Sequence, residues 1–211
     1  ADKAFIENSY KLREQTLRNY ILQQHQTAQN SRAKFSQNSA LEGYKLYFQE
    51  FPESSQVADM HFFYGDLLYD MGRYDEAGQQ YSWVVEKAPQ NKFSAKSGQN
   101  LLLAVERAVP KDEELQKRIG DSIDPIPLDP RVEKFLQSAK WYLQKFPNSE
   151  RDAEIRFKTG RLYYQSNHFN DAESIFKEVI QKHPKTKYSE YSANLLLDIY
   201  NLKKDYEGLS K

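Results

Sequence analysis

The sequence predicts an all-α fold of repeated helix pairs, a helical-hairpin solenoid that a proline-rich connector interrupts. Residues 45–54 (KLYFQEFPES) match residues 140–149 (KWYLQKFPNS), so one stretch occurs twice at an offset of 95 residues. Within each copy, apolar residues recur three and four positions apart, which is the period of an amphipathic helix. A repeat of helical segments at a fixed period is typical of chains whose units stack into a continuous core.

Composition supports a folded chain and excludes several classes of function. Of the 211 residues, 14% are aromatic, which excludes wholesale disorder. Thirty basic and thirty acidic side chains balance, so no global positive field would recruit nucleic acid or anionic lipid. The longest apolar runs have about five residues, whereas a membrane-spanning helix needs roughly 20. The first 20 residues show no signal peptide, and the absence of cysteine excludes disulfides and thiolate sites.

The two copies also share a finer pattern. The recurring positions are Gly65, Tyr74, Ala77, Tyr81, Val84 and Pro89 in the first copy, and Gly160, Phe169, Ala172, Phe176, Val179 and Pro184 in the second. A glycine in the first helix of a pair lets the second helix approach closely. The alanine, the aromatic residue and the valine form one apolar stripe on the second helix, and the proline ends it. This pattern resembles the tetratricopeptide repeat, a helix–turn–helix unit of about 34 residues.

Two details resemble a particular group of such proteins. The phrase Phe-Pro-x-Ser precedes a new helix in both copies, and Ala40 and Ala77 lie further apart than the usual period. Both features are similar to those of bacterial envelope proteins of the outer-membrane assembly lipoprotein and Tol–Pal-associated type. The resemblance implies a periplasmic or outer-membrane-associated protein of a bacterium, with a cytoplasmic location as the alternative.

The helices are predicted in order from local signals. Residues 2–36 contain neither glycine nor proline and carry a helical stripe, which predicts one long helix or two abutting ones. Ser39 and Glu42 form a capping box that predicts the start of the next helix. The helices expected after it span residues 40–51, 55–71, 74–88, 93–109, 131–146, 150–166, 170–182 and 187–203. Tyr200 and Tyr206 fit a last unit.

The chain is therefore expected to contain two modules and a connector. The predicted boundaries are 1–109 for the first module, 110–130 for the connector and 131–211 for the second module, whose last repeat is truncated. Three prolines between residues 125 and 130 exclude a helix there. Asp121, Asp124 and Asp129 lack the spacing and the glycine of a calcium loop. We expect a solvated spacer, and the alternative is a docking segment for another chain.

No motif indicates catalysis, a metal site or a cofactor. The eight glycines are scattered singly, so there is no phosphate-binding loop and no nucleophile turn. Histidines paired one helical turn apart would suggest a metal, but the four present, His25, His61, His168 and His183, are not so spaced. We expect structural roles for them, packing in the case of His61. Short lysine clusters are mixed with acidic residues and predict a solvated face. An enzyme would need a catalytic domain outside this chain.

The resemblance implies where a partner would bind. The first helix of each tetratricopeptide pair lines a concave surface. The positions implied to face it are Asp59, Phe62, Asp66, Tyr69, Asp70, Phe157, Arg161 and Tyr164. In each copy two aromatic residues lie seven positions apart on one helix face, which suits an extended or helical peptide. The alternative is that these rings pack against the next repeat.

The charges at these positions indicate the kind of partner. Tetratricopeptide domains that capture an acidic C-terminal carboxylate use Lys, Asn and Arg, whereas this chain offers Phe62 and Asp66. A basic or amphipathic peptide therefore fits the first module better.

The sequence predicts a non-enzymatic protein-interaction scaffold within a bacterial envelope complex, with neither nucleic-acid binding nor direct membrane insertion. The alternative is a structural or oligomerisation segment of a larger repeat protein, whose ends stack on neighbouring repeats. The oligomeric state stays open.

Overall fold

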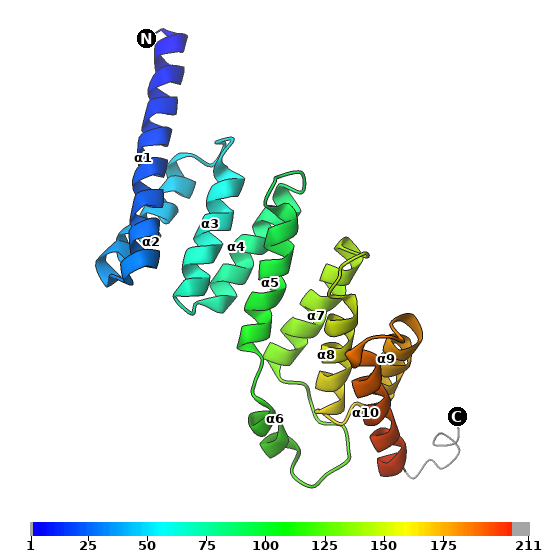
Figure 1. Ribbon diagram of the computed structural model, residues 1–211. Coiled ribbons are helices and arrows are strands. Elements are labelled where there is room, and N and C mark those ends of the chain that lie inside the picture. The colour runs from blue at the N-terminus through cyan, green and yellow to red at the C-terminus, as the bar shows by residue number, and fades with distance from the viewer. Residues whose placement is uncertain (1, 204–211) are drawn as a thin grey trace. The chain divides into compact units, whose positions relative to one another are not determined.

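The computed structural model describes residues 2–203, and within that range every regular element is a helix (Figure 1). The helices are α1 (Lys3–Ser31), α2 (Lys34–Glu50), α3 (Val57–Asp70), α4 (Tyr74–Lys87), α5 (Ser94–Ala108), α6 (Asp112–Ile119), α7 (Pro130–Lys145), α8 (Asp152–Tyr164), α9 (Phe169–Lys182) and α10 (Lys187–Lys203). The all-α, paired-helix class is confirmed. The chain divides into two compact units, Ala1–Arg107 and Ala108–Lys211. Tyr206 of the predicted last unit lies outside the described residues.

Both units are built from packed helix pairs. In unit 1, α1 packs on α2 and α3 on α4; in unit 2, α8 packs on α9, which also contacts α10. Helix α8 begins 95 residues after Val57, and α9 begins 95 residues after Tyr74. The predicted repeat therefore holds in three dimensions. Each unit has a core rich in aromatic side chains. The largest fully buried ones are Tyr44, Tyr47 and Tyr81 in unit 1, and Tyr142, Phe135 and Phe176 in unit 2.

Glycine at the centre of each pair permits the close approach that the sequence predicts. A Cβ added to Gly65 would lie 2.6 Å from Cε1 of Tyr81, and one added to Gly160 would lie 2.6 Å from Cε1 of Phe176. Both distances are far shorter than a van der Waals contact between carbons. The ring on the second helix therefore occupies the space of the missing side chain on the first.

The serine of the Phe-Pro-x-Ser motif has a structural role in both units. Ser54 Oγ lies 3.0 Å from Tyr47 Oη and accepts a hydrogen bond of 3.1 Å from the backbone N of Gln56. In unit 2, Ser149 Oγ lies 3.2 Å from Tyr142 Oη and accepts from the backbone N at residue 151. Each serine thus closes the turn between two helices and ties it to a buried tyrosine.

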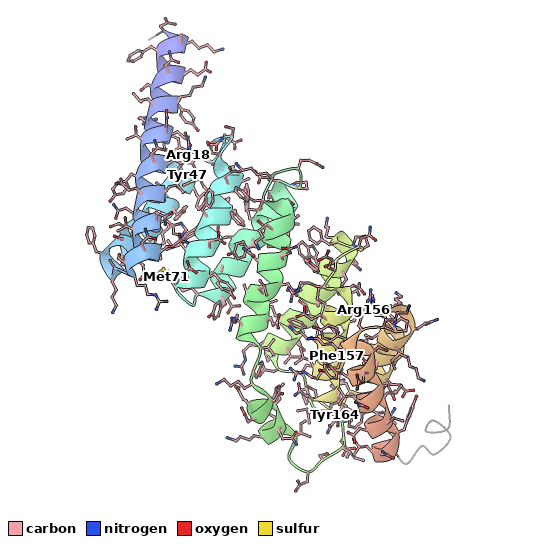
Figure 2. All side chains as sticks on the ribbon, viewed as in Figure 1. Arg18, Tyr47, Met71, Arg156, Phe157 and Tyr164 are labelled. Atoms are coloured by element: carbon pink, nitrogen blue, oxygen red, sulfur yellow. The ribbon has the colours of Figure 1, made fainter. Side chains whose placement is uncertain are left out.

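Helix α1 is joined to this turn in unit 1 by a buried carboxylate. Glu14 is 7% exposed and accepts hydrogen bonds from Tyr47 Oη at 2.5 Å and from Arg18 Nε at 2.9 Å. The two donor residues are labelled in Figure 2. A buried charge is tolerated where it is paired and hydrogen-bonded, as it is here. The network fixes the register of α1 against α2.

The break between α1 and α2 does not lie where the sequence predicts it. Helix α2 begins at Lys34, so Ser39 lies inside the helix and its predicted capping box is wrong. The chain turns instead at Arg32, whose φ of 52° is left-handed. Ile21 packs against Gly43 and holds α1 on α2. This tertiary packing imposes the left-handed conformation on Arg32, although an arginine adopts it less readily than a glycine.

Helix α6 precedes the proline-rich segment and was not predicted. Its first turn carries three acidic residues and its last turn Lys117 and Arg118, which complements the helix dipole at both ends. Its one buried residue is Leu115, which is 1% exposed. Arg118 reaches Asp129, which caps α7 by accepting a hydrogen bond of 2.9 Å from the backbone N of Arg131.

Part of the connector is held against the turn between α8 and α9. Asn167 Nδ2 donates to the carbonyl oxygens of Ser122 at 2.8 Å and Asp124 at 3.1 Å. The backbone N of Ile126 donates to Ser166 O at 3.1 Å, and His168 Nε2 donates to Ile126 O at 2.8 Å. The side chains of Asp121 and Asp124 are exposed, as expected for a solvated segment, but the backbone is docked within its own unit.

We predict that Asn167→Gly releases this segment without unfolding the α8–α9 turn. Asn167 has a φ of 60°, and the equivalent Gly72 of unit 1 has 74°, so glycine suits the backbone at this place. The substitution removes both side-chain hydrogen bonds to the connector. The amide of Ile126 should then exchange with solvent faster in hydrogen-exchange mass spectrometry. The reciprocal Gly72→Asn is the control and should leave exchange in unit 1 unchanged.

Candidate functional site

Three of the predicted binding residues, Asp66, Tyr69 and Asp70, line one cavity of unit 1. The cavity has a volume of about 180 Å³ and lies on α3. Its other lining residues come from the neighbouring helices: Gln29, Tyr81, Asn100 and Leu103. The sequence pattern places the α3 residues on one face, whereas Gln29 and Asn100 carry no local signal and are brought there by packing.

Asp66 is the best-held group of the cavity. Its Oδ1 accepts hydrogen bonds from Tyr81 Oη at 2.6 Å and Asn100 Nδ2 at 3.2 Å. Burial, with a contribution from the charge of Asp70, raises the pKa of this carboxyl above its ordinary value. A cation placed in the cavity would oppose that shift, so the site favours positive charge.

A second cavity adjoins the first. It has a volume of about 420 Å³ and shares Gln29 and Asp70 with its neighbour. Gln29 Nε2 donates to Asp70 Oδ2 at 3.3 Å, so this pair forms the boundary between the two spaces. The remaining lining residues are Ala28, Arg32, Gln37 and Leu67. Together the cavities make a polar recess along α1 and α3.

The other two predicted residues of unit 1 are engaged in packing. Asp59 is 8% exposed; it accepts from Asn91 Nδ2 at 2.8 Å and pairs with Lys92 Nζ at 2.7 Å. Phe62 stacks on Phe93 with ring centroids 4.3 Å apart. Both side chains therefore hold the segment that leads into α5 and do not line the cavity.

In unit 2 the predicted residues contact α10 and α6. Phe157 packs against Tyr188 and Tyr191 with ring centroids 5.7 Å away in each case, and Tyr164 hydrogen-bonds to Asp198 (Figure 2). Arg161 pairs with Asp112 at 3.0 Å. The structure thus places these three side chains against neighbouring helices of their own unit. Their part in partner binding stays a prediction.

One paired difference explains why the acidic cavity belongs to unit 1. Tyr81 carries a buried hydroxyl that needs an acceptor, and Asp66 supplies it. The equivalent Phe176 has no hydroxyl, and Arg161 stands where Asp66 would be. Removing the hydroxyl removes the need for the carboxylate.

The histidines have structural partners, as expected. His61 stacks between Phe48 and Trp83, and His183 donates to Asp152 Oδ2 at 2.6 Å. Within residues 2–203 no three acidic or histidine side chains are grouped so as to hold a metal ion. In the same range no helix is both long and apolar enough to cross a membrane.

Comparison with known proteins finds a match to a known repeat in part of unit 2. Residues 154–186, which span α8 and α9, match the tetratricopeptide repeat model. The helix pair α8–α9 is thus similar to a tetratricopeptide repeat. The helix pair α3–α4, which has the same internal pattern, is equivalent to it in position. Tetratricopeptide arrays form extended surfaces that bind other proteins. No match was found among curated proteins.

One solved structure supports the fold. A tetratricopeptide repeat protein from Parabacteroides merdae is 16% identical, with a TM-score of 0.50 over 90% of this chain. This chain spans 63% of the length of that protein. A structure of Pseudomonas aeruginosa pilF is 15% identical, with a TM-score of 0.42; the match covers 96% of this chain and 89% of that chain.

Proposed function

We propose that unit 1 binds a basic or amphipathic peptide of a partner protein in the recess on α3. The observation that carries the proposal is the cavity that Asp66, Tyr69 and Asp70 line together. A lysine or arginine side chain of the peptide would pair with the two carboxylates, while its alkyl stem would lie on Tyr69 and Leu103. Leu103 is 37% exposed and so is available to an apolar group.

A charge-only substitution tests the proposal. Asp66→Asn with Asp70→Asn removes two charges but leaves an amide oxygen to accept from Tyr81. A fluorescein-labelled amphipathic peptide of alternating arginine and leucine pairs is the probe, and its glutamate counterpart is the comparison. We predict that the double variant binds the arginine peptide about tenfold more weakly, which corresponds to about 1.4 kcal/mol.

The control keeps the same change of net charge away from the recess. Asp121→Asn with Asp124→Asn alters two exposed carboxylates of unit 2 and should leave the affinity unchanged. The measurement is fluorescence polarisation at low ionic strength, because added salt screens exposed charges. Equal affinity of the wild type for the arginine and glutamate peptides would refute the proposal.

We further propose that this scaffold works in a bacterial cell-envelope complex. The support is the Phe-Pro-x-Ser phrase and the long repeat period, which resemble envelope proteins of this repeat class. Fractionation of cells that express the full gene product tests it. Recovery with the periplasm or outer membrane is expected, and recovery in the cytosol would contradict it.

A second candidate function, self-association, is favoured by the exposed face of α1. Phe5 and Leu12 lie seven residues apart on one face and are 69% and 66% exposed. A second copy of the chain could bury both. Analytical ultracentrifugation over a range of concentrations should then show dimers that Phe5→Ser with Leu12→Ser abolishes. A monomer at every concentration would leave only the peptide scaffold.

A further inference from the structure

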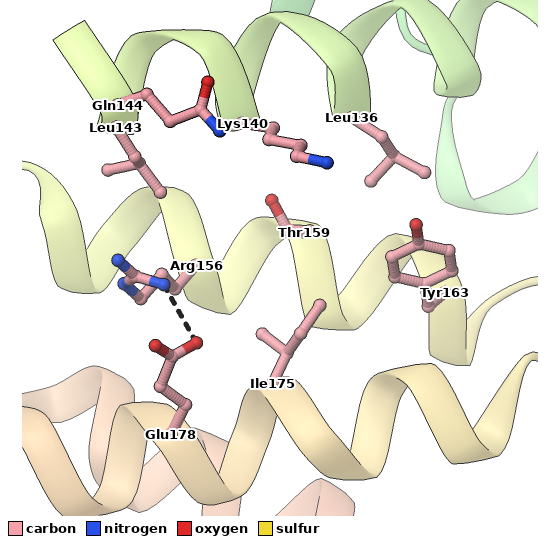
Figure 3. A pocket seen from close by; sticks show the side chains of 9 residues that line it. All are labelled: Leu136, Lys140, Leu143, Gln144, Arg156, Thr159, Tyr163, Ile175 and Glu178. Atoms are coloured by element: carbon pink, nitrogen blue, oxygen red, sulfur yellow. Dashed lines mark hydrogen bonds and ion pairs between the residues drawn. The ribbon is translucent and has the colours of Figure 1, made fainter.

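A cavity in unit 2 lies on a different face of α8 from the predicted binding residues. It has a volume of about 340 Å³ and lies between α7 and α9, with α8 as its floor (Figure 3). Its lining residues are Leu136, Lys140, Leu143, Gln144, Arg156, Thr159, Tyr163, Ile175 and Glu178. The size is that of a site for a small ligand or a large side chain.

In unit 1 the equivalent positions are filled by aromatic rings. The offset of 95 residues pairs Phe48 with Leu143, His61 with Arg156, Tyr64 with Thr159 and Trp83 with Glu178. The His61 ring stacks on Phe48 with centroids 4.0 Å apart and on Trp83 with centroids 3.9 Å apart. One ring from each of three helices therefore fills unit 1 where unit 2 has a cavity.

The residues that replace the rings leave an apolar space with polar ends. Arg156 pairs with Glu178, with Nη1 and Oε2 2.9 Å apart (Figure 3). It also pairs with Asp152, with Nε and Oδ2 2.7 Å apart. Leu136, Leu143 and Ile175 supply apolar lining to the same cavity. A guanidinium held by two carboxylates is neutralised and does not itself attract an anion.

Lys140 is the unneutralised charge at this cavity. The equivalent Lys45 of unit 1 pairs with Glu42 at 2.9 Å, but the residue equivalent to Glu42 in unit 2 is Gln137. Within residues 2–203 the ammonium group of Lys140 has no carboxylate partner. Its side chain runs along α7 on the side that faces α8 (Figure 3).

We propose that this cavity binds an acidic segment of a partner protein, which inserts one aromatic side chain and pairs a neighbouring carboxylate with Lys140. The aromatic ring takes the space that the Phe48–His61–Trp83 stack fills in unit 1. The carboxylate replaces the partner that Lys140 lost when a glutamine came to stand at position 137. This site selects the opposite charge from the recess in unit 1, so the chain would hold two different segments.

Selection from a phage-displayed library of random dodecamer peptides tests the proposal without assuming a sequence. The whole chain is the bait. We expect the enriched peptides to share an aromatic residue next to aspartate or glutamate. Enrichment of basic peptides alone, or no enrichment over a blank surface, would overturn the proposal.

Two variants then locate the site of the best synthetic peptide. Leu143→Phe, Arg156→His and Glu178→Trp together transplant the ring stack of unit 1 and fill the cavity. Gln137→Glu leaves the cavity open but gives Lys140 the internal partner that Lys45 has. We expect each to weaken binding by about tenfold, as loss of a bound ring or of a charge pair would. Unchanged affinity in either variant contradicts the proposal. If the triple variant does not fold, the affinity of Gln137→Glu alone decides the test.

Matched changes in unit 1 complete the design. Glu42→Gln frees Lys45 beside a filled space and should not create a second site for the peptide. Asp66→Asn with Asp70→Asn should leave the affinity for the acidic peptide unchanged, so a failure of the recess in unit 1 is distinguishable from a failure here. Two bound peptides per Glu42→Gln chain would show that the open cavity is not needed.

Discussion

Gly65→Ala is expected to destabilise unit 1, whereas Gly78→Ala, the same substitution in the partner helix, should stabilise it. A Cβ at Gly65 would lie 2.6 Å from the ring of Tyr81, which is fully buried and hydrogen-bonded to Asp66 and so has little freedom to move. A Cβ at Gly78 would meet only Leu101 Cδ1 at 3.4 Å. In a helix, replacement of glycine by alanine alone gains about 1 kcal/mol.

The free energies of unfolding of these two variants should differ by about 1–3 kcal/mol, which is the cost of overpacking a core, because both substitutions share the helical gain and only Gly65→Ala meets a ring. The chain has two tryptophans, Trp83 in unit 1 and Trp141 in unit 2. In a Trp141→Phe background, urea unfolding followed by fluorescence therefore reports on unit 1 alone. Gly160→Ala should repeat the loss in unit 2, because Phe176 lies equally close. Equal stability of the Gly65 and Gly78 variants would show that the two helices can separate at no cost.

The helix pairs could be predicted because their signals are local and occur twice. The glycine, the alanine and the aromatic residue of each pair lie within a few turns of one another, so their spacing reports directly on one helix–helix contact. For α4 the predicted start at residue 74 is confirmed, and α9 begins at Phe169, one residue before its predicted start. A second copy of the same spacing removes the ambiguity that any one apolar pattern has.

Features that depend on distant contacts could not be predicted in this way. The turn at Arg32 has neither glycine nor proline, and packing of α1 on α2 imposes it. Helix α6 did leave a signal in the charges of its two ends, but it is short and lies among residues that resemble a linker. At the candidate site, Gln29 and Asn100 reach Asp66 and Asp70 from helices far away in sequence. Residue types on α3 alone could not show which of its polar groups already have partners.

Acidification is expected to destabilise unit 1 through His61, and His61→Phe should remove much of this dependence. Burial between Phe48 and Trp83 lowers the pKa of the His61 imidazole to about 4, from an ordinary value of about 6.5. Between these two values the unfolded chain binds a proton that the folded chain does not. The stabilisation is therefore fully present above pH 6.5 and is lost as the pH falls toward 4, with a total of about 3 kcal/mol.

Phenylalanine at position 61 keeps a ring in the stack and removes the titrating group. It also removes the hydrogen bond of 2.7 Å that His61 Nδ1 donates to Gln80 Oε1, which should lower stability by a similar amount at every pH. The quantity to compare is thus the difference in free energy of unfolding between pH 7 and pH 4.5, measured by urea titration with Trp83 as the reporter. That difference should be smaller in His61→Phe than in the wild type by about 2 kcal/mol, because carboxylates titrate equally in both.

His25 is the internal check: burial also lowers its pKa, so His61→Phe should retain some acid sensitivity of imidazole origin. An identical pH dependence in variant and wild type would mean that the stacked imidazole is already protonated in the folded chain, or that the rings separate when it gains its charge.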